Sequence, residues 1–176
     1  MSIHLYQSQK VQRYIGKGVY DDLPWAEDQV DPLTLWYADV FFIRRERYLV
    51  IANPLTKFTF FVFRYNKKTH PDFMETFKER LSFTMKAAEI DPSKYLEQCD
   101  MLVPFEKPDR SASAHLSRIK TDYKDSIEYN KRGVHPSEAE SVYNTHIVDY
   151  LTTYNKKDYD YVKRRFYHEL LLRRWA

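Results

Sequence analysis

The sequence predicts an α+β fold in which an antiparallel sheet, formed by a three-strand meander plus one or two further strands, packs against four to five helices. Two observations predict it. Runs of aromatic and β-branched residues separated by short polar turns are concentrated before residue 65, whereas apolar residues at helical spacing dominate after residue 70. Strands that precede helices along the chain are typical of α+β domains, with the helices on one side of the sheet.

The meander is the part of this sheet that the sequence predicts most directly. Residues 34–43 are apolar at both sets of alternating positions, which favours a central strand that is covered on both faces. Polar turns separate this run from two further runs of aromatic and β-branched residues. The expected strands are residues 34–43, 48–52 and 57–64, with additional short strands at residues 3–6 and 101–105.

Helices are expected where capping residues precede apolar residues at helical spacing. Three such caps are predicted, formed by Asp72 with Glu75, by Ser111 or Ser113, and by Ser137 with Glu140. The main helices are expected at residues 72–91, 111–127, 137–151 and 158–175, with short helices at residues 7–15 and 92–98. Residues 17–33 contain prolines and an aspartate pair and are expected to form a surface loop.

Composition and charge exclude several classes of protein. The chain has 176 residues, of which 28 are basic and 25 are acidic, so the net charge of +3 does not by itself indicate a nucleic-acid-binding protein. Cys99 is the only cysteine, which excludes an intramolecular disulfide and fits a reducing compartment. The N-terminus has no signal-peptide pattern, and no apolar run is long enough to cross a membrane. We therefore expect one cytoplasmic domain, residues 1–176, without a membrane partner.

No metal site and no cofactor are predicted. None of the six histidines has a second histidine four residues away, the spacing that places two ligands on one helix face, and no cysteine pair supports a zinc site. The segment Gly16-Lys17-Gly18 is too short for a phosphate-binding loop. Cys99 would need a base and an orienting group to act as a nucleophile, and a lone cysteine is more often a small buried hydrophobe.

The first candidate site lies at a loop-to-helix junction and comprises Asp109, Arg110, Ser111, His115, Arg118 and Lys120. Free N–H groups at a helix N-terminus favour anions, and Arg110 and His115 would add charge-assisted hydrogen bonds to a phosphate. The same pair is a minimal set for metal-independent RNA cleavage, in which His115 moves a proton and Arg110 stabilises the charged phosphorane. The other interpretation is structural: Asp109 caps the helix, and Arg110 pairs with it to hold the loop.

The second candidate site is the C-terminal helix. Residues 156–176 contain seven basic and three acidic residues, with tyrosine, phenylalanine and tryptophan between them. Basic and aromatic residues together suit phosphate contacts with base stacking, and they equally suit a protein interface. A third interpretation is an amphipathic helix whose apolar stripe belongs to the core and whose cations face water. The candidate binding residues are Lys163, Arg164, Arg165, Arg173 and Arg174.

Four short motifs follow one another along the chain. They are Ile3-His4-Leu5 with Gln9-Lys10, Trp36-Tyr37-Ala38-Asp39, Arg44-Arg45 leading through Ile51-Ala52-Asn53 to Thr56, and Asp109-Arg110-Ser111. Their order and spacing resemble a family of small uncharacterised bacterial domains that also occur on plasmids and phages. The resemblance covers about residues 1–155, so the basic helix at residues 156–176 looks like an addition. The family commonly has Asn at the position of Asp39. The resemblance implies no catalytic assignment, and its mobile-element context implies a role in conflict between phage or plasmid and host.

The sequence therefore leads us to expect a non-enzymatic binding or regulatory protein of phage or other mobile-element origin. Its target would be a nucleic acid or a nucleoprotein, as for an inhibitor of a host defence nuclease such as a CRISPR effector. One alternative is a small metal-independent ribonuclease that uses Arg110 and His115. The other alternative is a domain that binds a protein partner without nucleic acid.

Overall fold

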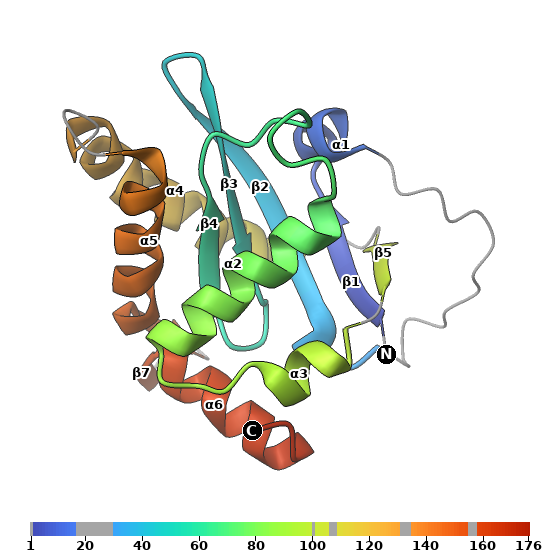
Figure 1. Cartoon of the computed structure of the whole chain (residues 1–176). Coiled ribbons are helices and arrows are strands. Elements are labelled where there is room, and N and C mark those ends of the chain that lie inside the picture. The colour runs from blue at the N-terminus through green and yellow to red at the C-terminus, as the bar shows by residue number, and fades with distance from the viewer. Residues whose placement is uncertain (1, 17–29, 100, 106–108, 131–134, 155–157) are drawn as a thin grey trace.

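The computed structural model of the protein describes residues 2–16, 30–99, 101–105, 109–130, 135–154 and 158–176. Its centre is a five-stranded sheet with strand order β4-β3-β2-β1-β5, and β6 and β7 form a separate two-stranded sheet (Figure 1). The strands are β1 (Ser2–Gln7), β2 (Leu35–Ile43), β3 (Glu46–Ala52), β4 (Thr59–Val62), β5 (Met101–Phe105), β6 (Leu151–Tyr154) and β7 (Asp158–Tyr161). The helices are α1 (Gln9–Ile15), α2 (Phe73–Ala87), α3 (Ser93–Glu97), α4 (Arg110–Asn130), α5 (Pro136–His146) and α6 (Val162–Arg173), with 3-10 turns η2 (Pro32–Thr34) and η3 (Ile147–Asp149). The predicted α+β class is confirmed, and most of the loop expected at residues 17–33 lies outside the described residues.

The predicted meander is confirmed, with β2 at the centre of the sheet. β2 pairs antiparallel with β3, and β3 pairs antiparallel with β4. β1 and β5 are the two further strands, but β1 runs parallel to both of its neighbours, with His4 opposite Leu35 of β2 and Ser2 opposite Met101 of β5. The sheet is therefore mixed and not wholly antiparallel. A parallel pair needs a long crossover, and the residues between β1 and β2, which include α1, supply one.

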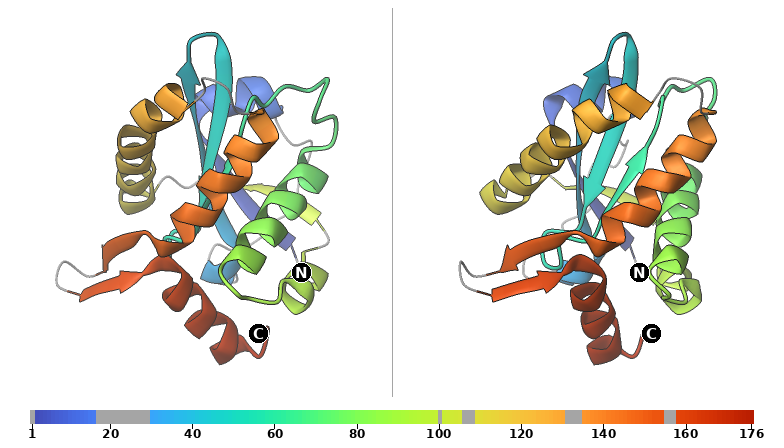
Figure 2. Two further views of the ribbon diagram at one scale, coloured as in Figure 1. Left: turned by 60° about the vertical axis from the view of Figure 1, so that its left-hand side comes forward. Right: turned by 90° about the vertical axis from the view of Figure 1, so that its left-hand side faces the viewer.

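Helices cover both faces of the sheet, and not one face as expected (Figure 2). Residues of α1, α2, α3 and α6 form the core on one face, and residues of α4 and α5 form the core on the other. The composition of β2 explains this arrangement. Trp36 and Val40 are buried in the first core, and Tyr37 and Phe41 are buried in the second. Because both sets of side chains are large and apolar, both faces need a covering layer.

The core on the first face joins aromatic rings from distant parts of the chain. The rings of Phe60, Phe77 and Phe166 stand edge-on to Trp36, at centroid distances of 5.6, 5.5 and 6.1 Å. Phe166 also stacks on Phe58 with a centroid distance of 4.4 Å. Since Phe166 belongs to α6, the C-terminal helix is packed into the same core as α2.

The helix starts agree only in part with the prediction. Asp72 caps α2 as expected, because its Oδ1 accepts the backbone N–H of Glu75 at 3.1 Å. The box expected from Ser137 and Glu140 does not form, and α5 begins at Pro136 with no side-chain cap. Proline suits a first helical position because it lacks the N–H that a cap would satisfy. This frees Glu140 to face the sheet edge instead.

The last helix begins at Val162, later than the sequence predicts. Residues 158–161 form β7, which pairs antiparallel with β6. Tyrosine and aspartate alternate over residues 158–161, which is a strand pattern, and this pattern prevails over the helical spacing that continues from Val162.

Candidate functional site

The first candidate site is built where the N-terminus of α4 meets the turn between β3 and β4. Asp109 lies just before α4, and its Oδ1 accepts the backbone N–H groups of Ser111 and Ala112 at 2.6 and 3.1 Å. The cap is therefore Asp109, and not Ser111 or Ser113, because a carboxylate in front of the helix takes the N–H groups that a serine cap would use. The Asp109 carboxylate thus occupies the helix end, so these two N–H groups are not available to an external anion.

Lys57 approaches this helix end from the β3–β4 turn. Its Nζ donates to Ser111 Oγ at 2.9 Å, and only 8% of the residue is exposed. Its φ of 60° lies in the left-handed region, which residues other than glycine adopt infrequently. The Lys57 N–H donates to the Asn53 carbonyl at 2.9 Å, and the Lys57 carbonyl accepts from the Thr59 hydroxyl at 2.8 Å. Burial lowers the pKa of Lys57, and the negative charge of Asp109 offsets part of that shift.

His115 lies one turn further along α4 and faces the sheet. Its Nε2 is 3.0 Å from Thr59 Oγ1. The Thr59 hydroxyl donates its single proton to the Lys57 carbonyl. The imidazole Nε2–H is therefore the donor in the contact between His115 and Thr59. Burial, followed by the positive charge of Lys57, lowers the pKa of His115 to about 4. The imidazole is therefore neutral at neutral pH.

The structure does not bring Arg110 and His115 to one point. Arg110 is exposed, whereas only 7% of His115 is exposed. Five residues along a helix turn a side chain by about 140° around the axis, so the two side chains leave α4 in different directions. No ion pair joins Arg110 to Asp109 among the described residues. The ribonuclease alternative needs Arg110 and His115 at the same phosphate and stays a prediction.

Arg118 and Lys120 also point away from each other. The Arg118 guanidinium lies 3.7 Å from the Asp122 carboxylate and 5.7 Å from the ring centre of Tyr150. Lys120 forms an ion pair with Asp39, which lies on β2. Each cation is thus engaged with a partner of its own chain, and the two do not form one phosphate-binding patch.

In the second candidate site, the basic residues at the start of α6 contact nearby acidic and aromatic side chains. Such pairs neutralise part of the charge that the sequence predicts for this helix. The contacts are Lys163 Nζ with the Asp149 carboxylate at 2.6 Å, Arg164 with the Asp160 carboxylate at 3.8 Å, and the Arg165 guanidinium over the Tyr154 ring at 4.8 Å. Of the two ion pairs, the one of Arg164 is the longer, and the Arg164 side chain remains 71% exposed.

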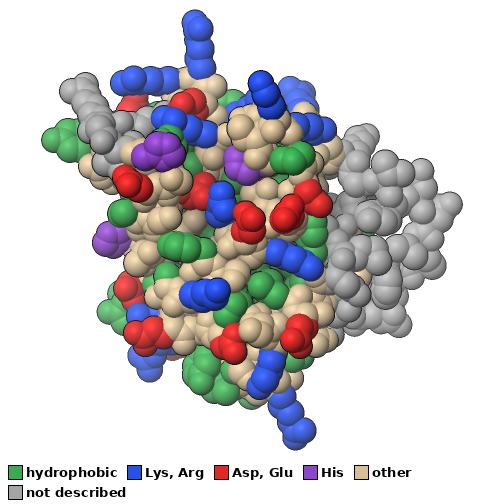
Figure 3. Space-filling model, in the orientation of Figure 1, with side chains coloured by type: hydrophobic (Ala, Val, Ile, Leu, Met, Phe, Trp, Pro, Cys, Tyr) green, Lys and Arg blue, Asp and Glu red, His purple; other side chains and the backbone are tan. Residues whose placement is uncertain are grey.

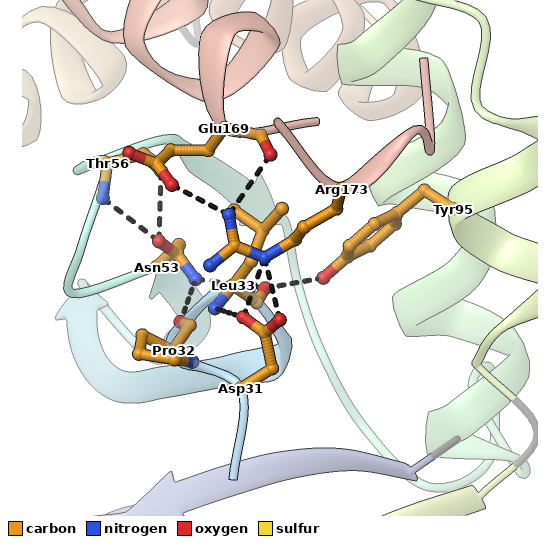
Figure 4. Close-up of polar contacts among 8 residues, drawn as sticks. All are labelled: Asp31, Pro32, Leu33, Asn53, Thr56, Tyr95, Glu169 and Arg173. Atoms are coloured by element: carbon orange, nitrogen blue, oxygen red, sulfur yellow. Dashed lines mark hydrogen bonds and ion pairs between the residues drawn. The ribbon is translucent and has the colours of Figure 1, made fainter. Parts of the chain in front are cut away.

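Arg173 belongs to a polar network that ties α6 to the segment before β2 (Figure 4). Its Nε donates to both carboxylate oxygens of Asp31 at 2.9 and 2.7 Å, and its Nη1 donates to Glu169 Oε2 at 2.7 Å. The same network contains Asn53, whose Nδ2 donates to the carbonyls of residues 32, 33 and 35 at 3.0, 3.1 and 2.8 Å. Arg173 therefore has two carboxylate partners inside the protein.

Exposed aromatic and apolar side chains mark the β6–β7 hairpin and α6. The hairpin projects from the rest of the molecule, next to α6 (Figure 2). The register places Leu151 opposite Tyr161 and Thr153 opposite Tyr159, so these four side chains share the outer face of the hairpin. We call the following exposed residues the hairpin–helix surface: Leu151, Tyr159, Tyr161, Arg164, Tyr167, Leu171, Leu172 and Arg174.

Sequence reasoning selected Arg164 and Arg174 in this surface but missed its hairpin. The missed signal was the alternation of tyrosine and aspartate at residues 158–161, next to a short run rich in threonine and tyrosine at residues 151–154. Lys57 was missed as well, because its partner Ser111 is 54 residues away in sequence and no local pattern connects them.

Among the described residues, neither the charges on the face of Figure 3 nor the metal-ligating side chains mark another site. On the face shown in Figure 3, Lys and Arg side chains are interspersed with Asp and Glu side chains and do not gather into one patch. Within the part of the chain that the structure describes, no group of three or more His, Cys, Asp and Glu side chains is placed to hold a metal ion. No helix in the described ranges is long and apolar enough to cross a membrane. Cys99 is a buried thiol that donates to the Tyr95 carbonyl at 3.2 Å.

Comparison with known proteins places the chain in a family. The family model described as "Domain of unknown function (DUF6933)" matches residues 4–165. No curated protein matches the chain. The match confirms the family resemblance expected from the sequence motifs, whereas the mobile-element origin stays a prediction. Because the model matches most of the chain, the protein belongs to the DUF6933 family of domains of unknown function.

Proposed function

We propose that the protein is a binding protein that holds a single-stranded nucleic acid, alone or in a nucleoprotein, on the hairpin–helix surface. The exposed tyrosines beside Arg164 carry this proposal. Tyr159 is 70% exposed, and Tyr161 and Tyr167 are also exposed on the same hairpin and helix. Aromatic rings that stand in water are platforms for base stacking, which tolerates any base sequence because every base has an aromatic face.

Phosphate contacts would come from the cations around these rings. Arg164 is held by Asp160 only at 3.8 Å and at a solvent-exposed position, so this ion pair opens at little cost. Arg174 is exposed at the other end of α6. Lys156 and Lys157 lie in the connection between β6 and β7, at residues outside the described ranges. Basic side chains next to stacking platforms favour a polyanion with unpaired bases.

The biological role that we propose follows the family resemblance. Related domains on plasmids and phages favour a target in the host, and a nucleoprotein target would include a host defence nuclease. The hairpin–helix surface would then inhibit such a nuclease by occupying the place along which the nuclease binds its nucleic acid.

A second candidate function is binding to a protein partner without nucleic acid. Leu171 and Leu172 are exposed on α6, with Leu172 at 65%, and Leu151 is exposed on β6. Aliphatic side chains do not stack on bases, whereas exposed apolar side chains are typical of the centre of a protein interface.

Fluorescence anisotropy with labelled single-stranded RNA, structured RNA and duplex DNA, at low and moderate salt, tests the proposal. We expect the single-stranded probe to bind most tightly and binding to weaken with salt. Tyr159→Ala should weaken binding about tenfold, since a stacked base contributes about 1–3 kcal/mol. Arg164→Ala should reduce the slope of log K against log salt by about 1. Tyr129→Ala is the matched control, because Tyr129 is 81% exposed but lies near the C-terminus of α4.

The outcomes separate the candidate functions. Equal losses in Tyr159→Ala and Tyr129→Ala, or no binding to any probe, would contradict the nucleic-acid proposal. Salt-insensitive association with a protein that is lost in Leu172→Ser would support the second candidate. Shortened RNA that depends on His115 would support the ribonuclease alternative.

A further inference from the structure

Ser111 and Lys57 form a pair of side chains that the binding function does not use. Ser111 lies in the first turn of α4 and is exposed to solvent, and Lys57 Nζ lies beneath it at 2.9 Å from Oγ. A serine hydroxyl in hydrogen-bond contact with an amine is the arrangement of nucleophile and base that serine–lysine enzymes use. We propose that Ser111 is a nucleophile with Lys57 as its base, and that the pair accepts acyl groups from small esters.

The surroundings of Lys57 suit an amine that loses its proton. Only 8% of the residue is exposed, and no carboxylate lies within ion-pair distance of Nζ among the described residues. Asp109 acts on Lys57 only through its charge from further away. Burial penalises the ammonium form and lowers the pKa of Lys57, which increases the neutral fraction that can act as a base.

The backbone from which this side chain projects is held by several contacts. Lys57 has a left-handed φ of 60°, a conformation that residues with a side chain adopt infrequently. The contacts of its N–H with Asn53 and of its carbonyl with Thr59 keep it there. On the other side, the Ser111 N–H is fixed by Asp109 at 2.6 Å. Both members of the pair are thus positioned before any substrate arrives, as nucleophilic catalysis requires.

The chemistry of the pair is a two-step acyl transfer. Neutral Lys57 Nζ takes the proton of Ser111 Oγ while Oγ bonds to the carbonyl carbon of the ester, and the leaving alkoxide then departs with the proton from Nζ. Water next attacks the acyl carbon and gives a proton to Nζ; the bond between Oγ and the acyl carbon breaks, and Oγ takes that proton back.

The test is covalent labelling of the full-length protein with a fluorophosphonate, read by intact mass and by sequencing of the tryptic peptide 111–118. We expect one adduct, on Ser111, whose rate of formation increases with pH as Lys57 loses its proton. Lys57→Met should slow labelling about 100-fold, the range of a general base. Ser111→Ala should abolish it, and Ser113→Ala is the matched control because Ser113 is an exposed serine on the same turn. Hydrolysis of p-nitrophenyl acetate should follow the same order among the variants.

Thermal unfolding of each variant shows whether a loss of labelling reflects a loss of fold. A folded Lys57→Met variant that labels as fast as the wild type would overturn the proposal. An adduct distributed over Ser113 and other residues, or no adduct on the folded wild type, would overturn it as well. None of these outcomes bears on the hairpin–helix surface, because the labelling experiment contains no nucleic acid.

Discussion

At His115, burial decides the charge of a side chain that the sequence presents as a catalytic candidate. The pKa of His115 is about 4 in the folded protein against an ordinary value of 6.5. Between these values the unfolded chain binds more protons than the folded protein, so the free energy of unfolding rises with pH. The contribution of the neutral imidazole to the free energy of unfolding is complete above pH 6.5 and is lost as the pH falls toward 4.

The variant His115→Gln tests this linkage. Glutamine retains an N–H donor for Thr59 but does not titrate. We expect the difference in unfolding free energy between wild type and variant to change by about 2 kcal/mol when the pH falls from about 7.5 to about 5, with the wild type losing more. Urea unfolding at the two pH values measures it. His4 and His70 also have lowered pKa values. Because wild type and variant both contain them, their contributions cancel in the difference. A constant difference would contradict the assigned pKa.

The cap that Asp109 forms at the start of α4 makes a second prediction about a single residue. Asp109→Ala removes the acceptor for the N–H groups of Ser111 and Ala112, and we expect a loss of about 1 kcal/mol in unfolding free energy. Asp125→Ala, an exposed position in the middle of α4, is the control and should change stability by less than about 0.5 kcal/mol. Chemical unfolding followed by circular dichroism measures both. Equal effects in the two variants would contradict the role of Asp109 as a cap.

At the scale of elements, α5 closes the open edge of the sheet. β4 is an edge strand, whose unpaired backbone groups would invite pairing with another chain. Asn144 Oδ1 accepts the Phe61 N–H at 2.7 Å, and its Nδ2 donates to the Phe61 carbonyl at 3.0 Å. Glu140, one turn earlier, accepts the Phe63 N–H at 2.5 Å and pairs with Arg80 of α2. Two side chains of a helix thus replace a neighbouring strand.

Asn144→Leu removes both hydrogen bonds to Phe61 while keeping the branched shape and the number of heavy atoms of the side chain. It leaves the N–H and the carbonyl of Phe61 buried without partners, at about 1–3 kcal/mol for each group. We therefore expect a loss of about 2–4 kcal/mol in stability and faster exchange of the Phe61 amide hydrogen. Hydrogen exchange followed by NMR measures the amide directly. Thr145→Ala, exposed on the next position of α5, is the control. Unchanged exchange at Phe61 would show that the edge is closed by other contacts.

At the scale of the whole molecule, α6 joins the core and the exposed surface. Phe166 is fully buried between Phe58, Trp36 and Tyr95, whereas Tyr167, the next residue, is exposed. At the other end of α6, Arg173 forms an ion pair with Asp31. The helix therefore stabilises the domain with one face and presents the hairpin–helix surface with the other.

The pair Phe166→Ala and Tyr167→Ala separates these two roles. We expect Phe166→Ala to cost about 3–5 kcal/mol, the usual range for a buried phenylalanine, and Tyr167→Ala to change stability by less than about 0.5 kcal/mol. Tryptophan fluorescence and circular dichroism should report one common unfolding transition in both variants. A small cost for Phe166→Ala, or a separate early transition, would show that α6 folds independently of the sheet.

Local patterns in the sequence predicted the elements whose neighbours lie close along the chain. The meander, the central position of β2 and the cap of α2 by Asp72 follow from runs, turns and spacings of a few residues. The loop-to-helix junction at Asp109 was predicted, since Asp109 does stand at the start of α4. Its chemistry was not predictable, because the burial of His115 and Lys57 depends on segments that pack over them.

The sequence by itself thus determined the α+β class and the meander. Only the tertiary structure decided the parallel pairing of β1, the helices on both faces, the closure of β4 by α5 and the contact between Lys57 and Ser111. The physical reason is that turns and caps depend on torsion angles and hydrogen bonds within a few residues. Strand order, burial and pKa depend on contacts between residues far apart in sequence, which form only when the whole chain has packed.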